Sequence, residues 1–245
     1  EPAILICAFH TGFNMLGIIL LLPFKSGISR LMCRIVKEEK SMLTRELDFS
    51  VIDVPPTALR IARASINEIF LVIMQVIRDL TIAETPYNQL SRKLDAADSG
   101  LREVKRFMAA VTSTPESSAL HESHLDIIHS TEHLERLSEA CREVDNIRTA
   151  GHDQFLRNLT ISQMKQFDGV ISWLKEEIPV SPLKGVEDVS SLFAHTRKTK
   201  REKIISEIAC GRIDPDSAFH LLEAMRWVDR IAYHIWRALF HATKR

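Results

Sequence analysis

The last part of the chain, residues 214–245, has the sequence DPDSAFHLLEAMRWVDRIAYHIWRALFHATKR and indicates the fold class. Its apolar residues recur at spacings of three and four, which places their side chains on one face of an α-helix. Asp214 is a candidate N-cap, and the proline at 215 suits a first helical turn. We therefore expect a helix over 215–243, whose apolar seam consists of Ala218, Leu221, Met225, Val228, Ala232, Ile235 and Leu239.

Five stretches upstream show the same helical period and are separated by short breaks. Pro55 and Pro56 open the first stretch, residues 179–185 (PVSPLKG) end the fourth, and Gly211 is a candidate C-cap for the fifth. No strand or hairpin pattern competes with them. The sequence therefore predicts an all-α fold with a six-helix bundle in a domain over 51–245, the first five helices spanning 56–81, 87–112, 116–148, 153–178 and 187–209.

The composition excludes several classes of protein. Lysine and arginine together number 32, as do aspartate and glutamate, so the formal net charge is zero and there is no basic excess of the kind that binds nucleic acid. The four cysteines are far apart and form no CxxC pair, which argues against a disulfide framework or a zinc site. Glycine-rich phosphate loops and the common hydrolase motifs are absent, so we do not expect an enzyme.

The N-terminal segment is strongly apolar and carries no formal charge from Pro2 to Phe24. A helix of that length is roughly 34 Å long, enough to cross the hydrocarbon core of a bilayer. A signal peptide would need a basic start and a small-residue cleavage site, and neither is present. We therefore predict a membrane helix within residues 1–25. Because the chain begins at Glu1 and enters this run at once, we expect it to be a fragment.

A basic segment follows the apolar run and forms a predicted linker over 26–50. Its excess of lysine and arginine places the C-terminal side of the membrane helix in the cytoplasm under the positive-inside rule. Apolar residues between Ile28 and Val36 share one helical face, which suits either a helix on the membrane surface or a plain connecting helix.

Three residues of the membrane segment, His10, Asn14 and Gly17, lie at spacings of four and three and line one stripe of a helix. Polar groups in hydrocarbon need partners, so this stripe should face other protein segments or a wet cavity. Two interpretations remain open, namely hydrogen bonds that join membrane helices and direct contact with a transported ion.

The segment AFHTGFNMLGIILLLPF, residues 8–24, resembles the H-x-x-F-N-x-x-G segment of type II sodium-dependent phosphate cotransporters (Na/Pi cotransporter family). His10, Phe13, Asn14, Gly17 and the following Pro23 match that pattern. The resemblance implies the last membrane helix of a multi-pass transporter whose inverted repeats hold phosphate and sodium near the midplane. The serine-rich substrate motif of the family would lie upstream of this chain.

The soluble part resembles PhoU-like domains, whose signature is approximately E-R-I-G-D-x-x-x-N-I. Glu135, Arg136 and Glu139 match a first copy, and Arg226 and Asp229 match a second copy 90 residues later. The resemblance implies two three-helix repeats and carboxylates that hold a divalent metal, with Asp95 or Asp98 contributing from a neighbouring helix. The alternative is that Arg136 and Arg226 form ion pairs between helices. Several signature positions differ, since Glu143 and Tyr233 replace the asparagines and Met225 replaces an acid.

Two further clusters have competing interpretations. His129 and His133, four residues apart, are either a metal-binding pair or part of a solvated histidine-rich face that includes His121 and His124. The basic run RKTKR at 197–201 is either a solvated face or a patch that contacts acidic lipid or another domain.

We therefore expect the C-terminal part of a bacterial sodium-dependent phosphate symporter in the inner membrane, with a cytoplasmic and regulatory PhoU-like domain. Its expected partners are phosphate and sodium, bound by upstream repeats, and the lipid bilayer, while the soluble domain is a candidate homodimer. Sodium is the coupling ion of the whole transporter. The alternative is a membrane-anchored PhoU-like regulatory module of phosphate homeostasis.

Overall fold

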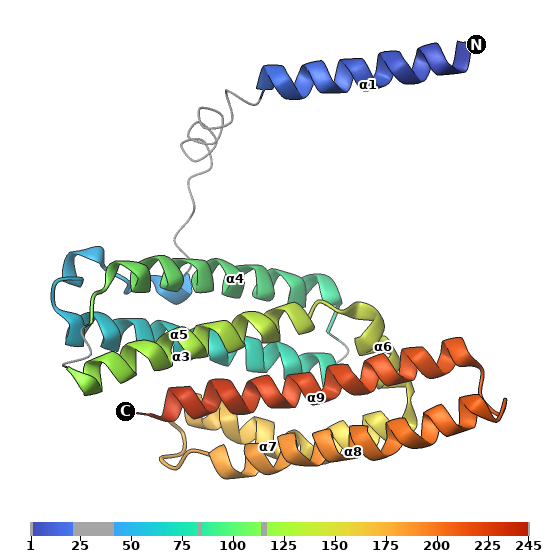
Figure 1. Ribbon diagram of the computed structural model, residues 1–245. Coiled ribbons are helices and arrows are strands. Elements are labelled where there is room, and N and C mark those ends of the chain that lie inside the picture. The colour runs from blue at the N-terminus through green and yellow to red at the C-terminus, as the bar shows by residue number, and fades with distance from the viewer. Residues whose placement is uncertain (1, 22–41, 83–84, 114–116, 245) are drawn as a thin grey trace. The chain divides into compact units, whose positions relative to one another are not determined.

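The computed structural model describes residues 2–21, 42–82, 85–113 and 117–244, and these residues contain helices and connections but no strand (Figure 1). The predicted all-α fold is thus confirmed. Residues divide into two compact units, Glu1–Lys40 and Ser41–Arg245. Most of the predicted linker, including the segment around Ile28 to Val36, lies outside the described residues.

The first unit contains helix α1 (Pro2–Leu21). Its sequence has no Asp, Glu, Lys or Arg, and its central side chains such as Phe9 and Phe13 are exposed. Among the described residues, no helix meets the combined length and apolarity required of a membrane span. The membrane helix within residues 1–25 therefore stays a prediction.

The second unit begins with two short 3-10 helices, η2 (Met42–Thr44) and η3 (Phe49–Val51). Both contact α3, and the intervening Leu47 is fully buried. The second compact unit begins at Ser41 and includes these short helices. Its longer helices are α3 (Pro55–Ile82), α4 (Tyr87–Ala110), α5 (Ser118–Ala140), α6 (Val144–His152), α7 (Gln154–Leu174), α8 (Leu183–Ala209) and α9 (Pro215–Thr243).

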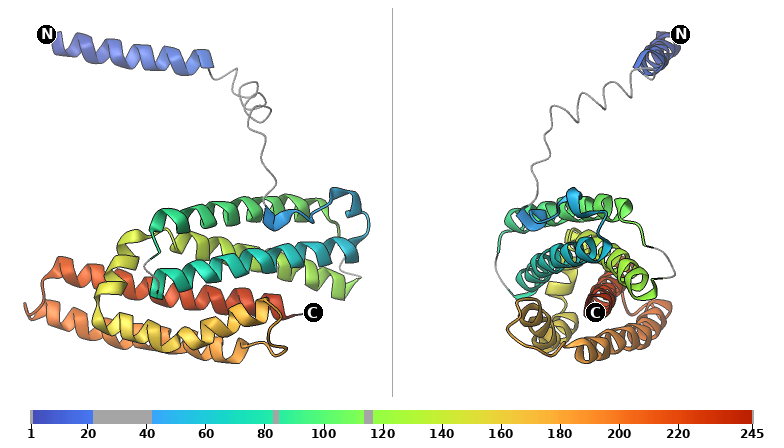
Figure 2. Two further views of the ribbon diagram at one scale, coloured as in Figure 1. Left: turned by 180° about the vertical axis from the view of Figure 1, so that it is seen from behind. Right: turned by 90° about the vertical axis from the view of Figure 1, so that its left-hand side faces the viewer.

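Six of these helices form two groups of three that pack against each other, and the short α6 contacts α7 and α9. Helices α3, α4 and α5 contact one another, and α7, α8 and α9 do the same. Helix α3 packs on α7 and α5 packs on α9, so these four lie between α4 on one side and α8 on the other (Figures 1 and 2). Both groups share one contiguous hydrophobic core, in which Phe70, Phe107 and Phe167 are among the largest fully buried side chains.

The predicted helix ends agree closely with the structure at α9. The Asp214 carboxylate accepts a hydrogen bond from the Ser217 backbone N–H at 2.9 Å, as expected of an N-cap. This bond lowers the pKa of Asp214. Gly211 adopts a φ of 67° after α8, which confirms its predicted role as a C-cap residue.

The predicted helix over 116–148 is wrong as a single element, because it divides into α5 and α6 at residues 141–143. The break leaves carbonyl oxygens without their usual partners in the helix. Trp227 of α9 donates its indole N–H to the Ala140 oxygen at 2.7 Å, and the Tyr87 hydroxyl donates to the Cys141 oxygen at 3.4 Å. Side chains from other helices thus stabilise a break that has no proline or glycine.

Candidate functional site

The carboxylates that the sequence predicts as a contribution from a neighbouring helix lie on α4, and they are bound by Ser138 of α5 and by Arg142 in the turn after α5. Arg142 donates to Asp98 at 2.7 Å and to Asp95 at 2.8 Å. Asp98 also accepts a hydrogen bond from the Ser138 hydroxyl. One guanidinium therefore holds both acids that the sequence proposed as metal ligands from a neighbouring helix.

The first signature copy on α5 forms ordinary ion pairs. Glu135 accepts two hydrogen bonds of 2.9 Å from the Lys105 ammonium group of α4. Arg136 pairs with Glu139 one turn later at 2.9 Å, and both side chains are largely exposed. In the second copy, Arg226 pairs with Glu223 of its own helix at 3.3 Å. The predicted interhelical role of Arg136 and Arg226 is wrong, because each pairs within its own helix.

Asp229, the acid of the second signature copy, lies on α9. It points toward α8 and not toward the α5 acids. Its carboxylate lies 2.8 Å from Nε of Arg197 on α8 and is mostly buried. Burial raises the pKa of Asp229, and the positive charge of Arg197 partly offsets that increase. The basic run at 197–201 thus supplies one residue to the helix interface.

The four predicted acids do not fit a shared metal site. Each one, Glu135, Glu139, Asp98 or Asp229, has a basic partner at 2.9 Å or less. Across the described ranges, no three His, Cys, Asp or Glu side chains converge so that they could hold a metal ion. Each of these acids is therefore neutralised by a nearby basic side chain.

A histidine cluster joins α5 to α9 and is the most unusual polar feature of the unit. The Nδ1 atoms of His133 and His234 lie 3.1 Å apart, at hydrogen-bond distance. His241 is buried, and its Nδ1 lies 2.8 Å from the Asp126 carboxylate, which is also buried. The ring of His129 stacks on His241 with centroids 5.0 Å apart.

The surroundings of this cluster favour neutral imidazoles. Burial lowers the pKa of His133 to about 4, and the neighbouring His234 and Arg237 contribute in the same direction. Burial also lowers the pKa of His234 to about 4, assisted by Arg230. A hydrogen bond between two neutral imidazoles needs one donor and one acceptor, which the pair can provide. His133 and His234 therefore join two helices while both rings remain uncharged near pH 7.

The sequence analysis missed half of this cluster. It considered His129 and His133 of α5, as a metal pair or a solvated face, but not His234 and His241 of α9. The solvated interpretation holds for the exposed His129 and is wrong for His133, which is partly buried against α9. A signal was present, because His234 and His241 are seven residues apart and share one helical face.

The other two histidines of α5 have a separate partner. His124 and His121 lie 2.9 Å and 3.2 Å, through their Nδ1 atoms, from the hydroxyl of Ser113 after α4. Burial lowers the pKa of His124. Cys141 at the end of α5 is completely buried, and burial raises the pKa of its thiol to about 12. A thiol with that pKa is a poor nucleophile and metal ligand at neutral pH.

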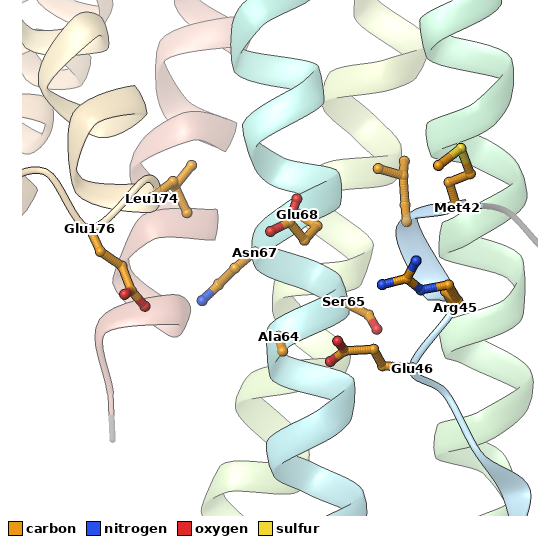
Figure 3. Close-up of a pocket in the computed structure, with 10 residues that line it drawn as sticks. Met42, Arg45, Glu46, Ala64, Ser65, Asn67, Glu68, Leu174 and Glu176 are labelled. Atoms are coloured by element: carbon orange, nitrogen blue, oxygen red, sulfur yellow. The ribbon is translucent and has the colours of Figure 1, made fainter.

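A polar groove of about 430 Å³ crosses α3 between η2 and the end of α7 (Figure 3). Its lining includes the charged residues Arg45, Glu46, Glu68 and Glu176. Glu176 follows α7 with a φ of 61°, a conformation that glycine adopts more readily. The groove mixes three carboxylates with one guanidinium, and its wall includes the buried Ser65.

The predicted polar stripe lies on α1. Nδ2 of Asn14 is 3.1 Å from Nε2 of His10, so the two side chains share one helix face as predicted. Phe13 stacks with Phe9 at a centroid distance of 6.4 Å. Gly17 lies in the same helix, whereas Pro23 is outside the described residues.

Comparison of the chain with protein-family models, with curated proteins and with solved structures finds no match. The resemblance to Na/Pi cotransporters and to PhoU-like domains therefore stays a prediction, which is developed below.

Proposed function

We propose that this chain is the C-terminal part of a sodium-dependent phosphate cotransporter, with α1 as its last membrane helix and Ser41–Arg245 as a cytoplasmic regulatory domain. The observation that carries the proposal is the segment with His10, Phe13, Asn14 and Gly17, which matches the family pattern within an uncharged run of sequence. Such a run is long enough to cross a bilayer if it is helical throughout.

The arrangement of the helical unit supports the second half of the proposal. A PhoU-like domain made of two three-helix repeats would place equivalent helices in equivalent contacts. In this unit the first helices of the two groups, α3 and α7, pack together, and so do the third helices, α5 and α9. Arg136 and Arg226 of the two signature copies also lie on the paired third helices.

The proposed mechanism is alternating access, with phosphate and sodium bound between membrane repeats. In that setting the hydrogen bond between His10 and Asn14 would satisfy two polar groups within hydrocarbon. The same pair could instead turn toward a neighbouring helix or a transported ion. The helical unit would then regulate transport and would not bind the transported phosphate itself.

The direct experiment measures phosphate uptake by the complete protein in vesicles, with and without an inward sodium gradient. We expect uptake that depends on the gradient. We also expect the Asn14→Ala variant to reduce uptake, whereas Leu16→Ala, two residues away on the opposite face of α1, should leave it largely unchanged. Uptake that ignores sodium would contradict the coupling, and equal activities of both variants would contradict the role of the stripe.

A second candidate is a membrane-anchored regulatory module without transport activity. It is favoured by the division of the chain, because Ser41–Arg245 forms a compact unit separate from Glu1–Lys40. The same vesicle experiment discriminates the two candidates. A complete protein that inserts into the bilayer but takes up no phosphate under any gradient would favour the anchored module.

A further inference from the structure

The outer face shared by α8 and α9 carries basic residues that form no ion pair between helices. Arg197 and Asp229 connect the two helices at 2.8 Å. A short turn joins α8 to α9, and the two helices lie side by side in opposite directions (Figures 1 and 2). Arg201, one turn after Arg197, and Arg226, one turn before Asp229, therefore lie on the same side of the Arg197–Asp229 pair along the helix axes. Lys198 and Arg201 are both exposed.

Three cations of this face lack a carboxylate within ion-pair distance among the residues that the structure describes: Lys198, Arg201 and Arg237. The guanidinium of Arg237 instead lies over the rings of Trp236 and Phe240, at 5.4 Å and 5.1 Å from their centroids. The remaining basic residues, Arg226 and Arg230, are each paired with one glutamate. Even when Glu202, which is exposed one turn after Lys198, is counted, the cations of this face outnumber its carboxylates.

Apolar side chains alternate with these cations. Ile205, one turn after Arg201, is 41% exposed, and Phe219 near the start of α9 is 58% exposed. Tyr233, two turns after Arg226, is 42% exposed and packs edge-on against Trp236. Exposed apolar and aromatic side chains interspersed with cations are typical of helices that lie on a membrane surface.

We propose that this face, defined by Lys198, Arg201, Ile205, Phe219, Tyr233 and Arg237, binds the surface of an anionic phospholipid bilayer. Lysine and arginine attract phosphate headgroups, while Phe, Ile and Tyr enter the boundary between headgroups and acyl chains. A second copy of the same face is disfavoured because the unpaired cations would repel one another.

This inference does not depend on the transporter assignment. If α1 enters the bilayer, every variant of the full chain will associate with vesicles whatever the lipid charge, so binding alone cannot test the face. The test therefore needs a probe on the face itself. Ala194 is exposed, lies one turn before Lys198 and can carry a polarity-sensitive fluorophore through the substitution Ala194→Cys.

In the full-length chain, Cys7, Cys33 and Cys210 are replaced by serine, and the buried Cys141 is retained because its thiol will not react. The probe at 194 is compared on vesicles of phosphatidylcholine with and without phosphatidylglycerol. We expect a blue-shifted, stronger emission only on the anionic vesicles, reversed by high salt. A matched probe at Ala109→Cys on α4 should not respond.

The charge reversal K198E/R201E should weaken the response to anionic vesicles by about tenfold or more, and the matched reversal R92E/R102E on α4 should leave it unchanged. Identical emission on neutral and anionic vesicles would overturn the proposal. A response to soluble polyglutamate but not to vesicles would also overturn it and assign the face to an acidic protein partner. Circular dichroism of each variant checks that the helices are intact.

Discussion

The two three-helix groups have the same helix order but place their charges in opposite ways. In α3–α5 the second helix supplies acids, Asp95 and Asp98, and the turn after the third supplies Arg142. In α7–α9 the second helix supplies Arg197 and the third supplies Asp229. Each group thus neutralises its own acids, so the two halves do not combine their carboxylates into one centre. The comparison shows how a repeated arrangement of helices can persist while its polar sites diverge.

The largest expected change in stability tests whether the two groups fold separately or together. Phe107→Ala in the first group and Phe193→Ala in the second each remove a buried ring from one shared core. We expect each variant to lower the free energy of unfolding by about 3–5 kcal/mol within a single cooperative transition. Urea unfolding followed by circular dichroism and by tryptophan fluorescence measures this. Two separate transitions, with each variant shifting only one, would show that the groups are independent.

The histidine cluster connects the two groups and makes their association depend on pH. Unfolding returns His133 and His234 from a pKa of about 4 to about 6.5, so the unfolded chain binds protons first as the pH falls. Stability is therefore full above about pH 6.5 and decreases toward pH 4. Because both side chains are partly exposed and mutually coupled, we expect a loss of about 2–3 kcal/mol.

Urea midpoints measured between pH 7.5 and 4 test this expectation. The double variant H133Q/H234Q should have a flatter profile over that range, whereas H195Q, at an exposed position of α8, should retain the profile of the parent chain. A parent chain whose stability is constant across this range would show that the imidazoles are not held neutral.

The ion networks of the two groups should respond alike to removal of their acids. Asp98→Asn leaves Arg142 with Asp95 alone, and Asp229→Asn leaves the partly buried Arg197 without its carboxylate. We expect each substitution to cost about 1–2 kcal/mol in the free energy of unfolding. Because each acid already has a basic partner, added Mn²⁺ or a chelator should not change the melting temperature of the parent chain. A rise with Mn²⁺ that Asp98→Asn abolishes would restore the metal-site interpretation.

The smallest effect concerns two helix ends in the second group. Gly211 after α8 and Glu176 after α7 both have positive φ, 67° and 61°. Gly211→Ala should destabilise the unit by about 1 kcal/mol, whereas Glu176→Gly should be neutral or stabilising by less than that. Thermal melting of both variants tests this asymmetry. A marked loss of stability in Glu176→Gly would indicate that the carboxylate at the groove supports the fold.

The sequence predicted local features well because they depend on neighbouring residues. Helix α9, its Asp214 cap and the Gly211 ending followed from periodicity and from backbone preferences that act within one or two turns. The predicted apolar seam positions of α9, among them Met225, Val228 and Ile235, are buried. The shared helix face of His10 and Asn14 likewise follows from their spacing.

The sites were predicted less well because they depend on partners far apart in the chain. The i,i+3 spacing of Arg136 and Glu139 allows the ion pair that they form within α5, but nothing in the spacing indicated that Lys105 of α4 would bind Glu135. Nor did local sequence show that His133 would meet His234, about 100 residues later.

The sequence by itself determined that this chain is helical and where most helices begin and end, because helical period and capping are local properties. Only the tertiary structure decided that α5 stops at Ala140, because the indole N–H of Trp227 from α9 binds the Ala140 carbonyl oxygen there. It also decided which charges and imidazoles face each other, because two helices must pack before their side chains can pair. Local sequence patterns determine the helices, and contacts between distant residues determine which side chains interact.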